Sequence, residues 1–202
     1  MGHVGFSNTY FTALECIDLL ARVPRLTHCT FELHYATLSP SISTSRLRLT
    51  ELEDLHLNCL ETTPLLLVLD SLALPALRSL KVVGDFRNPD APAVVHPFLE
   101  RAPNLHIFDA QFYQPRNGIS STALSALLSR ALSLTPLLTV LRLVQAPASP
   151  IFELLHLLSV SATFLPVIEK IDCFALSVDW TDSNITTLVK ALTSRWKAAD
   201  SC

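Results

Sequence analysis

The sequence predicts an α/β fold made of about six stacked units, each of which contributes a short strand and then a helix. Three observations lead to this prediction. An L-x-x-L-x-L spacing of apolar residues recurs through the chain, a proline usually precedes it at a fixed distance, and a helix-like segment follows it. Because 50% of the 202 residues are hydrophobic, the chain has enough apolar side chains for a core.

The clearest copy of this six-residue spacing, called the hexad, runs from Leu52 through Leu55 to Leu57. Apolar residues stand at hexad positions 1, 4 and 6 in six copies, which begin at residues 26, 52, 77, 105, 138 and 168. Two residues before position 1 stand Pro24, Thr50, Pro75, Pro103, Pro136 and Pro166. A proline ends a helix and favours extended backbone before it, so we expect a helix to give way to a strand at these points.

Helix start signals lie between the hexads. Two further helices are expected from apolar periodicity over residues 120–134 and 185–196. The sequence suggests no element for residues 1–11. The expected helix starts are the capping box of Thr12 and Glu15, the hydroxyl-proline pairs Thr63–Pro64 and Ser149–Pro150, and the near variant Asp90 with Pro92.

A strand, a turn and a helix in every 25 to 33 residues is the plan of a leucine-rich repeat. We therefore predict a single leucine-rich-repeat domain over residues 1–202, with about six irregular repeats and a poorly defined segment at 1–11. The solenoid would form a horseshoe arc, with a parallel strand ladder on its concave side and helices on its convex side.

Residues at hexad positions 3, 5 and 7 should face the open concave side, because successive strand residues point to opposite faces of a sheet. We expect the polar residues at these positions to form a protein-binding surface. The candidates chosen from these positions are His28, Thr30, Asp54, His56, Asn58, Ser79, Lys81, Asp109, Gln111, Arg142, Lys170 and Asp172.

The hexads, the prolines before them, and segments such as residues 74–81 and 98–105 resemble the irregular repeat region of fungal F-box proteins. The resemblance covers about residues 12–196. It implies substrate recognition for a ubiquitin ligase, with a Skp1-type adaptor as a partner if an F-box exists outside this chain. An F-box itself is not evident: residues 150–158 resemble one only locally, and they stand where the fifth unit needs its helix.

The sequence lacks the motifs G-x-G-x-x-G, G-x-x-x-x-G-K-S/T, G-x-S-x-G and H-E-x-x-H, which favours a binding module without catalytic activity, and we expect no cofactor. A net charge of -3 gives no basic field for nucleic acid, and no apolar stretch reaches the roughly 18 residues that a membrane span needs. The chain starts without a signal-peptide pattern. Its five cysteines are dispersed and never spaced as C-x-x-C, which predicts reduced thiols in an intracellular protein, cytoplasmic or nuclear.

Asp54, His56 and Asn58, with Cys59 beside them, superficially suggest a catalytic or metal site. The His-Asp pair has no clear nucleophile in reach, and neither H-x-x-x-H nor C-x-x-C supports zinc. Two alternatives to the ligase role remain. One is a general leucine-rich-repeat scaffold unrelated to ubiquitin, and the other is a small α/β enzyme in which Asp54 and His56 would be the first residues to mutate.

Overall fold

The computed structural model describes residues 3–34, 46–59, 61–84, 91–112, 128–130, 132–146, 148–175, 186, 189–190 and 193. The described residues form an α/β fold around a parallel sheet of seven strands, called the main sheet. Its strands, in spatial order, are β1 (His3–Phe11), β2 (His28–Leu33), β4 (Asp54–Cys59), β6 (Ser79–Gly84), β7 (Ile107–Phe112), β8 (Val140–Ala146) and β9 (Lys170–Ala175).

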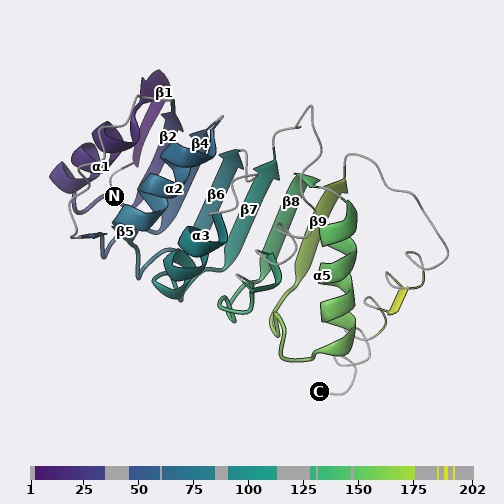
Figure 1. Cartoon of the computed structure of the whole chain (residues 1–202). Helices are drawn as coiled ribbons and strands as arrows, with labels where there is room; N and C mark the ends of the chain where they lie inside the picture. The colour runs from purple at the N-terminus through teal and green to yellow at the C-terminus, as the bar shows by residue number, and fades with distance from the viewer. Residues whose placement is uncertain are drawn as a thin grey trace.

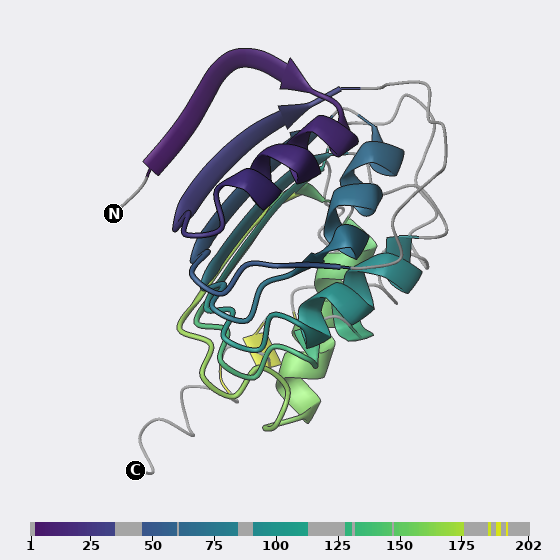
Figure 2. The ribbon, with the colours of Figure 1, turned by 90° about the vertical axis from the view of Figure 1, so that its left-hand side faces the viewer.

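The helices lie along one face of the main sheet (Figures 1 and 2). Two short strands pair beside them as a small second sheet. Among the described residues, no helix combines the length and the apolar character needed to cross a bilayer. The helices are α1 (Ala13–Arg22), α2 (Thr62–Ser71), α3 (Ala91–Glu100) and α5 (Ala148–Val160), and the two short strands are β3 (Leu47–Arg48) and β5 (Leu72–Ala73).

The α/β class and the parallel strands are as predicted. Each of the six hexads coincides with a main-sheet strand that begins at hexad position 3, from β2 to β9. Strand β1 is an addition, because it lies in the segment 1–11 for which the sequence suggested no element. It pairs with β2 at residues 3–5 and 10–11, and it leaves the regular register between them.

The first helix start is confirmed in detail. The Thr12 backbone N–H donates to Glu15 Oε2 over 2.8 Å, and the Glu15 backbone N–H donates to Thr12 Oγ1 over 3.2 Å. Two other starts were predicted two residues too late, since Thr63 and Ser149 lie inside the first turns of α2 and α5. Proline is tolerated there because the first N–H groups of a helix have no partner within it.

The two helices expected from periodicity are described only in part. Over residues 120–134, residues 128–130 and 132 are helical and residues 133–134 form a turn. Over residues 185–196, residues 186, 189–190 and 193 are helical. The remainder of both segments lies outside the described residues, as does Asp90.

The prolines before the hexads occupy a tight turn, and they do not themselves end the helices. Helix α1, for example, ends at Arg22, ahead of Pro24. In five units the N–H of hexad position 1 donates to the carbonyl three residues earlier, over 3.1–3.3 Å, and the proline is the second residue of that turn. Its fixed φ suits this position. The accepting carbonyls belong to Val23, Leu74, Ala102, Thr135 and Leu165.

Unit two has Thr50 in the place of proline, and it departs from this turn. The Leu49 N–H donates instead to the carbonyl of Ala73 over 3.1 Å, next to the pairing of β3 with β5. Arginines stabilise the nearby C-terminus of α2: Arg101 donates to the carbonyls of Leu69 and Leu72 over 3.1 and 3.0 Å, and Arg46 donates to that of Asp70 over 3.0 Å. Cationic side chains are stabilising at the C-terminus of a helix, because the helix dipole places partial negative charge there.

One backbone carbonyl in each unit ties it to the next. The carbonyl at hexad position 2 accepts the N–H groups of positions 2 and 3 of the following unit, over 2.8–3.0 Å. This double acceptance extends the strand ladder back by one residue and fixes how neighbouring hexads align. The carbonyls that accept in this way are those of Thr27, Glu53, Arg78, His106 and Thr139.

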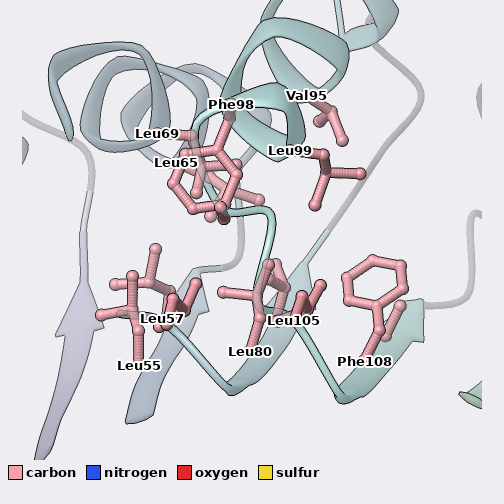
Figure 3. Close-up of a cluster of buried hydrophobic side chains, with 14 of the residues drawn as sticks. Leu55, Leu57, Leu65, Leu69, Leu80, Val95, Phe98, Leu99, Leu105 and Phe108 are labelled. Atoms are coloured by element: carbon pink, nitrogen blue, oxygen red, sulfur yellow. The ribbon is translucent and has the colours of Figure 1, made fainter. Parts of the chain in front are cut away.

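The core lies between the main sheet and the helices. In the first five units the side chains at hexad positions 1, 4 and 6 are at most 6% exposed. Figure 3 shows Leu55, Leu57, Leu80 and Phe108 of the sheet beneath side chains of α2 and α3, including Phe98. Full burial of one such side chain contributes about 1.5–3 kcal/mol, so the hexads provide much of the stability.

Strand β8 contains a bulge with an unfavourable backbone conformation. Val144 pairs with Phe174 and Ala146 pairs with Ala175, which leaves Gln145 as the extra residue. Gln145 has a φ of 59°, in the left-handed region. This conformation costs a residue other than glycine about 1–2 kcal/mol of conformational free energy.

We predict that Gln145→Gly raises the free energy of unfolding by up to about 1 kcal/mol, because glycine adopts positive φ freely. The matched control is Gln111→Gly on β7, where Gln111 pairs with Val144 in regular strand. That change should lower the free energy of unfolding by about 0.5–1 kcal/mol. Urea unfolding curves measure both, and equal losses in the two variants would contradict strain at Gln145.

Candidate functional site

The candidate site is the open face, defined as the face of the main sheet opposite the helices, at hexad positions 3, 5 and 7. Strand pairing aligns these positions into rows. With strands about 4.8 Å apart, six strands span about 25 Å. From β2 to β9, row 3 is His28, Asp54, Ser79, Ile107, Val140 and Lys170; row 5 is Thr30, His56, Lys81, Asp109, Arg142 and Asp172; row 7 is Glu32, Asn58, Val83, Gln111, Val144 and Phe174.

The structure places all twelve predicted candidates in these rows. Most are half-buried, while the residues between them in β2 and β4 are fully buried, as the alternation of a strand requires. Lys170, at the last strand, is exposed. Asp109 is the most deeply placed candidate, at 9% exposed. The sequence pattern therefore located the face and its register correctly.

Over β7 to β9 the charged candidates form an ion chain. Arg142 bridges two carboxylates: its Nη1 lies 3.3 Å from Asp109 Oδ2, and its Nε lies 3.3 Å from Asp172 Oδ2. Lys170 Nζ lies 3.1 Å from the same oxygen of Asp172. The hydrogen bonds from Lys170 and Arg142 lower the pKa of Asp172, and the bond to Asp172 with the charge of Asp109 raises the pKa of Arg142.

A second polar group lies at β2 and β4. His28 Nε2 is 2.6 Å from Asp54 Oδ2, and His28 Nδ1 is 2.8 Å from the hydroxyl of Thr27. The order hydroxyl, imidazole, carboxylate is also that of nucleophilic hydrolases. Here, however, the imidazole and the carboxylate are each about two-fifths exposed, whereas catalytic electrostatic interactions are strongest where bulk water is largely excluded.

His56 is not the partner of Asp54 that the i, i+2 spacing suggested. The Asp54 carboxylate is taken by His28 of the neighbouring strand, because same-face residues of one strand are farther apart than register partners. The His56 Nε2 atom is buried, and it has no hydrogen-bond partner among the described residues. Burial, followed by the charge of Lys81, lowers the pKa of His56, and Asp109 partly opposes this.

Apolar side chains on the open face were not among the predicted candidates. Ile107 in row 3 is 40% exposed and Phe174 in row 7 is 64% exposed. Val140 and Val144 beside them are half-buried. Only the polar members of the rows were selected from the sequence, although apolar residues at outward strand positions are themselves a signal of an interaction surface.

Other chemistry-bearing groups lie away from this face or are buried. A cavity of about 280 Å³ is lined by Tyr10, Phe11, Glu15, Asp18, Leu19 and Arg22, and so it does not include His28, Asp54 or His56. Burial raises the pKa of Cys29 to about 12 and that of Cys173 to about 11. Within the part of the chain that is described, no group of three or more His, Cys, Asp or Glu residues is placed to hold a metal ion.

No family model and no curated protein matches the chain.

We predict that His56 makes the protein less stable in mild acid. Because the folded pKa of His56 is lowered, the unfolded chain binds more protons just below its ordinary pKa of about 6.5. The stability from this group is fully present above that value, and it is lost as the pH falls toward the folded pKa. His56→Gln should remove this part of the pH dependence between about pH 7.5 and pH 5.

Urea unfolding of the wild type and of His56→Gln across this pH range isolates the contribution of His56. An NMR titration of the imidazole measures its folded pKa directly. A titration midpoint at or above the ordinary value for histidine would contradict the burial argument.

Proposed function

We propose that the chain is a leucine-rich-repeat solenoid whose open face is concave and recognises another protein. The observation that carries this proposal is the alignment of three rows of partly exposed side chains along parallel strands, on the face that the helices leave uncovered. Repeat arrays use such extended faces for binding. The repeated turn and the repeated carbonyl contact support stacked, equivalent units.

By its resemblance to the repeat region of fungal F-box proteins, we propose substrate recognition for a ubiquitin ligase as the physiological role. The chain would select the substrate and carry out no catalysis itself, in the cytoplasm or the nucleus. A Skp1-type adaptor would be a second partner if an F-box exists outside this chain. A general scaffold without any link to ubiquitin is the alternative within the same structural class.

A small α/β enzyme is the alternative from a different class. The hydrogen-bonded chain from Thr27 through His28 to Asp54 is the observation that favours it. The same contacts are also expected where exposed strand residues of neighbouring strands pair. The extent of the aligned rows favours recognition over catalysis.

Photo-crosslinking tests recognition on the open face. A benzophenone amino acid replaces Asn58, a half-buried residue in row 7, or Glu153, an exposed control residue on α5. We expect a defined protein adduct in cells from position 58 and none from position 153. The yield of this adduct should fall when Lys81→Glu reverses a charge in row 5 of the neighbouring strand. Equal labelling from both positions would remove the open face as the recognition surface.

The link to ubiquitin has a separate test. If the chain serves a ligase, the protein expressed from its full coding sequence should co-purify with a Skp1-type adaptor. Quantitative mass spectrometry against a tag-only control measures this enrichment. Absence of the adaptor, together with a specific adduct from position 58, would leave the general scaffold as the function.

A further inference from the structure

The two halves of the open face differ in where their apolar side chains lie. Over β2 and β4, rows 3 and 7 hold only polar side chains, such as Asp54 and Glu32. Over β7 to β9, row 3 holds the apolar pair Ile107 and Val140 beside Lys170, and row 7 holds the apolar pair Val144 and Phe174 beside Gln111. Phe174 is 64% exposed, so a large apolar surface stands in water unless something covers it.

Arg142 in row 5 stands between these two apolar pairs, and its orientation is fixed in advance. Its Nε and Nη1 atoms contact Asp172 and Asp109, and its side chain is 42% exposed. A guanidinium has five N–H donors, so these two contacts leave donors for a further acceptor. An arginine that is already held in place loses little conformational entropy on binding, and arginines within an apolar surround often dominate interface energies.

The charge around Arg142 favours an acidic ligand group. Lys81, Arg142 and Lys170 contribute +3 and Asp109 and Asp172 contribute -2, which leaves +1 over β6 to β9. The ion pairs found among the described residues do not include Lys81, whose strand partner is Asp109.

The opposite half of the face carries the opposite charge. Glu32 and Asp54 give -2 over β2 and β4 when the histidines are neutral. A carboxylate from a partner is therefore attracted to the half that holds Arg142.

The spacing of the rows selects the form of the ligand. Rows 3, 5 and 7 are two residues apart, or about 6.6 Å, and an extended segment places residues i, i+2 and i+4 at that same spacing. Rows 3 and 7 are about 13 Å apart over a width of about 10 Å from β7 to β9. This area is well below the roughly 800 Å² that each partner buries in a standard interface, so the ligand is a segment and not a broad surface.

We propose that the face of β7 to β9 binds an extended segment of the partner protein with the pattern apolar-x-acid-x-apolar. Its acid contacts Arg142, with Lys81 nearby, and its two apolar side chains cover Ile107 and Val140 in row 3, and Val144 and Phe174 in row 7. This inference rests on the proposed recognition function, and it names the anchoring half of the face and the chemistry of the ligand.

Selection of displayed random linear peptides on the whole purified chain tests the proposal. The enriched peptides should share the apolar-x-acid-x-apolar pattern. A synthetic peptide of that pattern should bind about tenfold more weakly, a loss of about 1.4 kcal/mol, to Phe174→Ser and to Arg142→Lys. Glu153→Gln on α5, away from the face, is the matched control and should bind as the wild type does.

Folding of each variant is checked by its urea midpoint. If Arg142→Lys fails to fold, Lys81→Gln replaces it, because Lys81 lies outside the ion chain. Enriched peptides that lack the acid, or whose binding survives Phe174→Ser, overturn the proposal. Peptides that instead depend on Glu32 and Asp54 overturn it and leave recognition by the open face intact. Peptides indifferent to every open-face substitution overturn both proposals.

Discussion

The shared carbonyl at hexad position 2 is the constraint on which the other features depend. Each of these carbonyls accepts hydrogen bonds from two N–H groups of the next unit, and this fixes the register of the next strand against the preceding one. A slip of one residue would turn the buried leucines to water and bring polar residues such as Asp54 and His56 into the core. The backbone contact and the hexad pattern therefore specify the same register, and that register forms the rows of the open face.

The units vary in length on the helix side without disturbing this register. Unit two replaces the proline turn with an extended approach through β3, and arginines 46 and 101 satisfy carbonyls at the end of α2. The approach through β3 stands where the other units have the proline turn, and loops and helix ends tolerate such variation better than a strand ladder does. Starts that are 25 to 33 residues apart are thus compatible with strands that pair residue for residue.

Sequence patterns predicted the features that depend on local spacing. The period of two placed Asp54, His56 and Lys81 on one face, and the capping box gave the start of α1. Features set by neighbours in space were missed. The partner of Asp54 is His28, twenty-six residues away, and β1 forms by pairing with β2. Phe174 stands at hexad position 7, where the pattern expects an outward side chain, but it was left out of the candidates because only polar residues were selected.

The ion chain around Arg142 contributes more to orientation than to stability. Its Asp109 and Asp172 contacts are 3.3 Å long, and Arg142 remains partly exposed, so solvent screens each pair and the pairs add little to stability. That gain does not require apolar neighbours, yet Ile107 and Val140 lie in row 3 on one side of Arg142, and Val144 and Phe174 lie in row 7 on the other. Exposed apolar side chains add nothing to folding while water covers them, whereas in an interface they would exclude water and strengthen the hydrogen bonds of the arginine at their centre. A binding role therefore explains the ion chain and its exposed apolar neighbours better than a contribution to folding does.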